Sequence, residues 1–394
     1  MNAPSQAAVA ANSRGMAALQ RGAFEDAAAA FAEACEADPA SGALQRNLAS
    51  AHRGGGNVEA ELEALEAALS IDRTDLIAWV RKAELHQRRG EKGPALAAWN
   101  GALQLAAPLR PWEGPLAAAL EGGQRFLEQA TADLRRTADN RLGPLAETLD
   151  ATERRRCNAF VDLTLGRRKA FVNECAGLHY PFLPADEFFD DVHFPWFADL
   201  AAATDAIAME LLALLDDPGE QLRPYVRMEA GIGETKWSEL DHDLKWGACF
   251  LYEYGEPNQP VLDRCPKTAA ALSAVPQPKL PGRAPNAFFS ILQPHTRIPP
   301  HTGVSNTRAI VHLPLIIPAG CGFRVGGETR EWVVGQPFAF DDTIEHEAWN
   351  DSDEMRAVLI CDVWNPHLTP REQEYIAEYY RATDEAGYAS ARGN

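Results

Sequence analysis

The sequence predicts an α+β protein in which an N-terminal solenoid of paired helices precedes a small β-barrel. At 394 residues the chain is long enough for two domains. Small and large apolar residues recur at one fixed interval in its first third, which is typical of a helical repeat array. Short runs rich in valine, isoleucine and phenylalanine follow one another in its last third, separated by glycine and proline, which is typical of a barrel.

The repeat interval in the first third is 34 residues, as the spacing of Gly22, Gly56 and Gly90 shows. The same interval separates a set of large apolar residues and a set of alanines: Phe31, Leu65 and Trp99, and Ala34, Ala68 and Ala102. This period is typical of tetratricopeptide (TPR) repeats, in which each unit is a helix pair. We therefore expect a TPR-like domain over residues 1–107. It would present either a concave peptide-binding surface or a solenoid that buries the flank of the next domain.

Helical patterning continues beyond the repeats, although the period ends. Residues 108–178 are rich in alanine, leucine and arginine at helical spacing, so we expect a helical connector there. Residues 179–394 would form the third segment, a β-barrel domain with a C-terminal helix. That helix is predicted to begin at Thr369, because Thr369 and Glu372 form a capping-box pattern with proline at the first helical position.

Composition excludes several classes of function. A net charge of −19 argues against a nucleic-acid partner, because the phosphate backbone requires a basic surface. No apolar run reaches the roughly 18 residues that span a bilayer, and the N-terminus lacks the basic start and apolar core of a signal peptide. The seven cysteines lack C-x-x-C spacing, so reduced thiols fit better than zinc or disulfides. We expect a cytoplasmic protein with no membrane span.

Five segments of the last third are predicted to form strands or a hairpin. Each is a short run of β-branched and aromatic residues bounded by turn residues, and one turns at Gly326 and Gly327. The segments cover residues 286–294, 306–318, 321–332, 336–340 and 354–364. Short strands that carry histidine and arginine suggest a small barrel with a metal in its mouth.

Two histidines in these segments are candidate ligands of one metal ion. His301 lies in PPHTG and His346 in FDDTIEHEAWN, and neutral imidazole is a good ligand for a divalent transition metal. Arg356 lies ten residues past His346 on a predicted apolar strand, where a fixed planar cation suits a dicarboxylate. The usual non-haem iron site adds a carboxylate two residues after the first histidine, and here that residue is Gly303. An iron site is the leading interpretation.

Three other residues compete for the role of ligand. His295 lies six residues before His301, where we expect a surface role at the end of a strand. Asp341 and Asp342 precede His346 and could supply the missing carboxylate. We expect these two to cap or hydrogen-bond the loop that presents His346.

The motifs of residues 180–375 resemble the aspartyl/asparaginyl β-hydroxylase family. The resemblance rests on HTG..N.R...HL, a following hairpin, FDD..EHEAWN, the arginine ten residues after that histidine, and DVW.P. It implies an Fe(II)- and 2-oxoglutarate-dependent dioxygenase on a double-stranded β-helix, the jelly-roll or cupin-like barrel. The family holds iron with two histidines and has glycine where relatives have a carboxylate, so Gly303 supports the match.

The resemblance also implies roles for single residues. His301 and His346 would be the metal ligands, and Ser290 with Arg356 would bind the distal carboxylate of 2-oxoglutarate. His312 would help to seat this cosubstrate near the iron. His301, His346 and Arg356 form the expected catalytic set. With dioxygen as the oxidant, iron and 2-oxoglutarate would convert a C–H bond of the substrate to C–OH with one oxygen atom, while the other oxygen atom enters succinate as 2-oxoglutarate loses CO2.

The substrate is less well defined by the resemblance. Animal members carry two arginines on the strand after the first histidine, whereas this chain has Arg308 but Ile310 in the second place. Arg308 and Trp237 are the expected substrate-binding residues. The substrate would be an aspartyl, asparaginyl or related side chain of a peptide or protein that the TPR repeats deliver. The alternatives are a lipid-linked acyl group or small molecule, and a catalytically silent scaffold.

Overall fold

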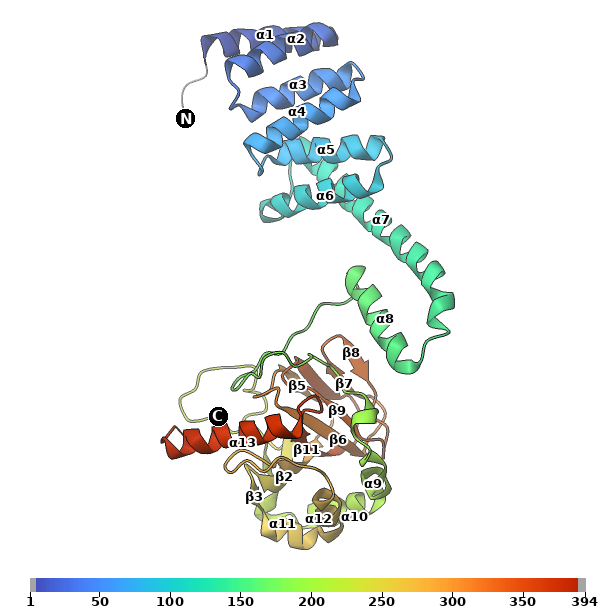
Figure 1. Cartoon of the computed structure of the whole chain (residues 1–394), viewed down its shortest axis with the longest axis vertical. Coiled ribbons are helices and arrows are strands. Elements are labelled where there is room, and N and C mark those ends of the chain that lie inside the picture. The colour runs from blue at the N-terminus through green and yellow to red at the C-terminus, as the bar shows by residue number, and fades with distance from the viewer. Residues whose placement is uncertain (1–4, 389–394) are drawn as a thin grey trace. The chain divides into compact units, whose positions relative to one another are not determined.

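The structure is a computed structural model, and it describes residues 5–388. Its contacts divide the chain into two compact units, which meet in sequence between Asp150 and Ala151. The first unit is helical, and the second combines two β-sheets with helices (Figure 1). The predicted order of a helical repeat region and a β-rich domain is confirmed. The division falls inside the expected connector, so the two connector helices belong to different units.

The first unit begins with helices paired at the predicted period. The described helices are α1 (Gln6–Gln20), α2 (Phe24–Ala37), α3 (Gly42–Gly54), α4 (Val58–Ile71), α5 (Leu76–Arg88), α6 (Lys92–Ala106) and the 3-10 turn η1 (Ala107–Leu109). Gly22, Gly56 and Gly90 close the first helix of each pair with φ near +73°. This left-handed conformation favours glycine, which explains why the glycine recurs at this point of every repeat.

Each repeat is held by one large buried side chain. Phe31 and Leu65 are 0% exposed and Trp99 is 2% exposed. A Cβ on Gly15 would overlap the ring of Phe31, and a Cβ on Gly123 would overlap the ring of Trp99. Gly123 lies in α7 (Pro115–Ala146), which packs against α6, so α7 covers the end of the repeat core.

The second unit begins with α8 (Ala151–Thr164), and Arg155 is one of the residues that dock it. Arg155 donates to the backbone oxygen of Phe188 at 2.7 Å and pairs with Glu328 at 2.8 Å. The remaining helices are η2 (Asp191–His193), α9 (Phe197–Ala202), α10 (Thr204–Asp216), η3 (Gly219–Gln221), α11 (Gln259–Arg264), α12 (Pro266–Ser273) and α13 (Pro370–Glu385). The predicted capping box of Thr369 and Glu372 is present at the start of α13.

The strands of the second unit form a seven-stranded and a four-stranded sheet within the described residues. The larger sheet contains β1 (Arg223–Pro224), β2 (Trp246–Glu253), β3 (Glu256–Pro257), β4 (Ala287–Leu292), β6 (Arg308–Ile316), β9 (Phe338–Phe340) and β11 (Arg356–Trp364). The smaller contains β5 (Thr296–His301), β7 (Cys321–Val325), β8 (Glu328–Arg330) and β10 (His346–Asn350). From β4 onward, strands order as β4-β11-β6-β9 and β5-β10-β7-β8, the crossed antiparallel order of a jelly roll.

Two apolar cores flank the larger sheet. Its outer face packs on α9 to α12 through residues such as Phe289, Leu313 and Leu359. Its inner face shares a second core with the smaller sheet, to which Leu292, Val358 and Phe323 contribute. Alternation along each strand therefore separates a structural face from an inner face, and the candidate site lies on the inner face.

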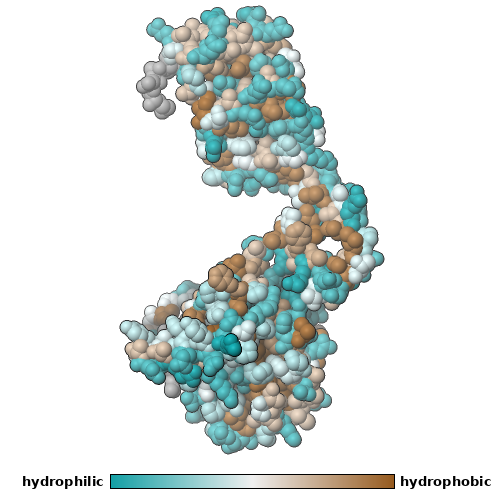
Figure 2. Space-filling model, viewed as in Figure 1, coloured by the Kyte–Doolittle hydropathy of each residue, from teal (hydrophilic) through white to brown (hydrophobic). Residues whose placement is uncertain are grey.

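The surface of the molecule agrees with its composition. Most of the face in Figure 2 is hydrophilic, with hydrophobic side chains gathered along the connector helices. Those that the structure exposes there include Leu134, Leu145 and Phe160. No helix among the described residues is both long and apolar enough to cross a membrane.

Candidate iron and cosubstrate site

Strand pairing brings the two predicted metal ligands together. In the antiparallel pairing of β5 with β10, His346 lies opposite His301, and their ring centroids are 4.0 Å apart. The Nδ1 atom of His301 is 2.8 Å from the backbone oxygen of Pro299, and that of His346 is 3.0 Å from the oxygen of Ile344. Donation to these carbonyls leaves the lone pair of each neutral ring on Nε2, the tautomer that binds a metal.

Both rings are held in the neutral form. Burial lowers the pKa of His301 to about 4, and nearby Lys236 adds to this effect. Burial and the neighbouring His301 also lower the pKa of His346. Neutral imidazole is the form that binds a divalent cation, so the pair needs no proton release at neutral pH.

The position beside Gly303 is filled by a carboxylate from another loop. A Cβ on Gly303 would overlap the carboxylate of Asp342, and the N–H of Gly303 donates to the backbone oxygen of Asp342 at 2.6 Å. Burial raises the pKa of Asp342 to about 7, against the opposing attraction of Arg308. Among residues 5–388, no third His, Cys, Asp or Glu joins the histidine pair in a cluster that could hold a metal.

The other competing residues have structural roles. Asp341 accepts hydrogen bonds from the backbone N–H of Thr343 at 3.0 Å and from the side chain of Asn173 at 2.7 Å. It therefore braces the loop before His346, as predicted. His295 is exposed and contacts Asp353 at 2.9 Å, in agreement with the expected surface role.

Arg356 lies fully inside the second unit without an acidic partner among the described residues. It is 1% exposed, and its guanidinium donates to Ser290 Oγ at 3.1 Å and lies 4.1 Å from the ring centroid of Trp332. Ser290 Oγ also accepts from the indole nitrogen of Trp246 at 3.1 Å. Burial lowers the pKa of Arg356 to about 9, so a charged guanidinium here calls for an anion.

Three buried polar atoms on this inner face have no hydrogen-bond partner. They are His312 Nδ1, Trp332 Nε1 and Arg356 Nε. The ring of His312 lies 5.0 Å from that of Phe340, which in turn lies 5.1 Å from His346. An unpaired buried donor costs about 1–3 kcal/mol, so these atoms indicate a polar ligand. The donor set fits the carboxylate of a keto acid, as expected for 2-oxoglutarate.

Arg308, a predicted substrate-binding residue, already has an acidic partner. Its guanidinium lies 2.7 Å from a carboxylate oxygen of Asp362, and that acid also accepts from the side chain of Asn286 at 3.0 Å. Ile310 pairs with Asp362 on one side and with Phe340 on the other. A substrate carboxylate would have to compete with Asp362 for Arg308, and Ile310 offers it no charge.

An aromatic wall extends from His301 along the inner face. The ring of Trp237 lies 5.0 Å from His301 and 6.2 Å from Trp246. Tyr225 stacks on Trp246 with centroids 4.0 Å apart. Trp237 was predicted to bind substrate, whereas Tyr225 and Trp332 were missed because single aromatic residues in loops carry no pattern that identifies them.

These features together define a two-sheet protein with a paired-histidine site and a buried arginine, and comparisons identify its family. The profile of the aspartyl/asparaginyl beta-hydroxylase family matches residues 201–366. Ornithine lipid ester-linked acyl 2-hydroxylase of Rhizobium tropici is 32% identical over 200 residues, which is 50% of this chain and 67% of that protein. The chain belongs to the aspartyl/asparaginyl β-hydroxylase family.

Animal relatives match over a shorter stretch. Aspartyl/asparaginyl beta-hydroxylase of Mus musculus is 39% identical over 132 residues, which is 33% of this chain but 18% of that protein. The chain thus spans less than a fifth of the length of this relative. For the helical unit, the TPR2B domain of yeast Sti1 superposes with a TM-score of 0.29 at 19% identity, over 33% of this chain and 99% of that one.

The close approach of Gly303 to Asp342 generates a stability prediction. Gly303→Ala should lower the free energy of unfolding by about 1–3 kcal/mol, because the new methyl group displaces the Asp342 carboxylate. Most of this loss should disappear in the Asp342→Ala background. Urea unfolding of the metal-free protein measures both effects. Gly233→Ala, where a Cβ would meet nothing within 4 Å, is the matched control. Simple additivity of the Gly303 and Asp342 changes would contradict the proposed overlap.

Proposed function

We propose that the chain is an Fe(II)- and 2-oxoglutarate-dependent hydroxylase. The observation that carries the proposal is Arg356, a fully buried cation without an acidic partner among the described residues, on the inner face that also carries the histidine pair. Family membership supports it, since relatives include hydroxylases. A catalytically silent scaffold is disfavoured, because nothing would then retain an unpaired buried arginine.

Each side chain would have a distinct task in this reaction. Bound iron with 2-oxoglutarate and dioxygen would supply the oxidation that converts a substrate C–H bond to C–OH. His301 and His346 would hold the metal through Nε2, in the tautomer that their backbone carbonyls impose. Arg356 with Ser290 would bind the distal carboxylate, and Trp332 would exclude water from it.

Two substrate classes are candidates under this proposal. The first is an aspartyl, asparaginyl or related side chain of a peptide or protein, as for the mouse relative by its name. The second is an acyl group, as the name of the Rhizobium relative states for that protein. Two observations favour the second class: Arg308 is ion-paired with Asp362, and Ile310 is apolar. Neither residue therefore offers a free positive charge to an acidic side chain of the substrate.

The repeat unit would deliver a peptide or protein substrate if the first class is correct. Its helix pairs provide the repeated architecture on which concave peptide-binding surfaces are built. We also propose a cytoplasmic, reducing location, because all seven cysteines are free thiols in the structure.

Removal of either histidine should abolish iron binding, because no other His, Cys, Asp or Glu among the described residues completes the site. His301→Ala and His346→Ala should each lose stoichiometric iron and succinate release. Elemental analysis and succinate assays measure the two effects. His295→Ala is the control and should keep both. Retention of iron by either variant would place the metal elsewhere.

Arg356→Ala should leave iron bound and weaken 2-oxoglutarate roughly ten- to a hundredfold. The change removes a charge-assisted pair worth about 1.5–3 kcal/mol. Arg356→Lys should restore part of the affinity, because lysine cannot reproduce the planar fork. Titration calorimetry gives the dissociation constants, and Arg297→Ala, at an exposed arginine paired with Asp351, is the control. An unchanged constant would mean that the cosubstrate binds elsewhere.

Deletion of residues 1–150 tests delivery by the repeats. The cut belongs before Ala151, because a cut at Pro108 would strip α7 of its packing against α6. The shortened protein should retain slow 2-oxoglutarate turnover without substrate, and should show a raised KM on a peptide substrate with little change in kcat. An unchanged KM would exclude delivery of the substrate by the repeats and would support an acyl group as the substrate.

A further inference from the structure

One buried tryptophan of the inner face lacks the hydrogen bond that its counterparts make. Trp99, Trp246 and Trp332 are the three buried tryptophans in the described part of the chain, each at most 5% exposed. The indole nitrogen of Trp99 donates to the side chain of Gln87 at 3.2 Å, and that of Trp246 donates to Ser290 Oγ at 3.1 Å. Trp332 Nε1 has no partner in the same part of the chain. Because a buried indole usually finds an acceptor, Trp332 Nε1 indicates an acceptor that a ligand brings.

Packing holds the Trp332 ring in one place. The residue follows β8 in a loop, and it is buried although Glu331 before it and Val333 after it are exposed. Its ring stacks on Phe323 with centroids 5.5 Å apart, and the guanidinium carbon of Arg356 lies 4.1 Å from its centroid. A surface loop therefore places one indole inside the second unit, in contact with the buried arginine.

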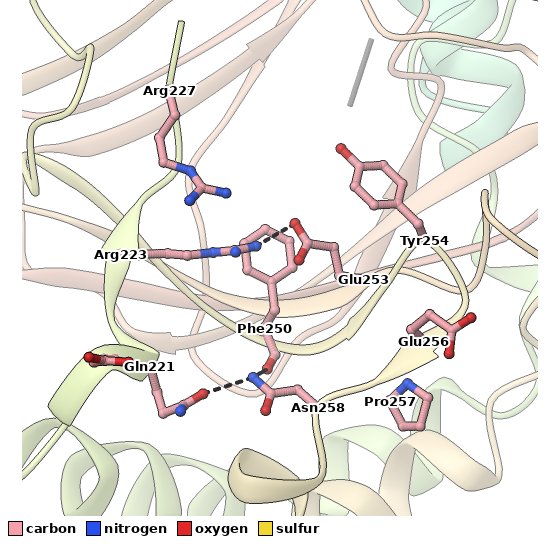
Figure 3. A pocket seen from close by; sticks show the side chains of 10 residues that line it. Gln221, Arg223, Arg227, Phe250, Glu253, Tyr254, Glu256, Pro257 and Asn258 are labelled. Atoms are coloured by element: carbon pink, nitrogen blue, oxygen red, sulfur yellow. Dashed lines mark hydrogen bonds and ion pairs between the residues drawn. The ribbon is translucent and has the colours of Figure 1, made fainter. Parts of the chain in front are cut away.

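A cavity of about 510 Å³ beside β1, β2 and β3 contains another stacked arginine, whose charge is neutralised (Figure 3). The Arg223 guanidinium lies 4.4 Å from the ring centroid of Phe250, and it is ion-paired with Glu253, as a dashed line in Figure 3 marks. Arg356 makes the same kind of contact with Trp332, but it has no acidic partner among the described residues. The stack at Trp332 therefore lacks the anion that the stack at Phe250 has.

Ser290 adds a hydroxyl hydrogen to the donors around Arg356. Its oxygen accepts from Trp246 Nε1 and from the Arg356 guanidinium, both at 3.1 Å. These contacts use the two lone pairs of the serine oxygen, so the hydroxyl hydrogen remains to donate. Arg356 Nε and Trp332 Nε1 are the other two donors without a partner. One carboxylate can accept about four hydrogen bonds and can therefore take all three donors, whereas water would leave the charge of Arg356 without a counterion.

We propose that Trp332 is a cosubstrate-binding residue that donates its indole N–H to the distal carboxylate of 2-oxoglutarate, beside Arg356 and Ser290. One charged and two uncharged donors would then bind this carboxylate. A keto acid that ends in a methyl group offers these donors no acceptor, so Trp332 would help the site to select a dicarboxylate over a monocarboxylate. The inference rests on the proposed function for the identity of the ligand, whereas the hydrogen bond can be observed without turnover.

The nuclear magnetic resonance signal of the Trp332 indole N–H tests the hydrogen bond directly. The full-length protein is loaded with Zn(II), which has no redox chemistry, so that ligands bind without turnover. The chain has nine tryptophans, and the indole signal that is lost in Trp332→Phe belongs to Trp332. Addition of 2-oxoglutarate should move this proton signal downfield. Addition of 2-oxopentanoate, which has a methyl group in place of the distal carboxylate, should not. An unmoved signal at saturating 2-oxoglutarate would overturn the proposal.

Dissociation constants from titration calorimetry separate a lost donor from damaged packing. Trp332→Phe keeps a ring beside Arg356 but removes the N–H, so it should weaken 2-oxoglutarate about tenfold and leave 2-oxopentanoate unchanged. Equal weakening of both keto acids would indicate lost packing alone and would overturn the proposal. Trp112→Phe is the matched control, because Arg110 also lies over Trp112, whose indole nitrogen already donates to the backbone oxygen of Ala106 at 2.8 Å. The control should change neither constant.

Succinate release from the Fe(II)-loaded protein distinguishes failure of this inference from failure of the proposed function. If the Trp332 signal moves with 2-oxoglutarate but no succinate is ever released, the subsite stands and the hydroxylase is refuted. If succinate is released while the Trp332 signal stays in place, the hydroxylase stands and Trp332 is not part of the cosubstrate site.

Discussion

The antiparallel pairing of β5 with β10 is the constraint on which the rest of the site depends. It sets His301 opposite His346 although 45 residues separate them in the chain. A shift of one residue in this register would turn one ring to the other face of the sheet. Both Nδ1 atoms donate to carbonyls two residues earlier in the same chain segment, so local backbone geometry also orients each ring.

Much of the fold could be predicted because the signals are local. The glycines at 34-residue spacing adopt φ near +73°, and a residue that needs a left-handed conformation is visible in any sequence. The capping box of Thr369 and Glu372 is equally local. The strand runs were recognisable for the same reason, since β-branched residues bounded by glycine and proline define them without reference to distant segments.

The surroundings of the two histidines could not be predicted in the same way. Trp332 stacks under Arg356, and Tyr225 covers Trp246, only because folding brings together segments that are separated in the sequence. The partner of Arg308 was hidden for the same reason, since Asp362 lies 54 residues away and meets it through the pairing of β6 with β11. These contacts change the expected class of substrate, because they show which arginine side chains are free to bind a substrate carboxylate.

The overlap between Gly303 and Asp342 bears on how such a site can evolve. The carboxylate that relatives with a three-residue iron site carry after the first histidine has no room here, because Asp342 already occupies that volume. A single Gly303→Asp change would add a second acid to a space that holds one, while the N–H of residue 303 remains tied to the backbone oxygen of Asp342. A carboxylate at position 303 would therefore fit only if Asp342 were displaced or replaced as well.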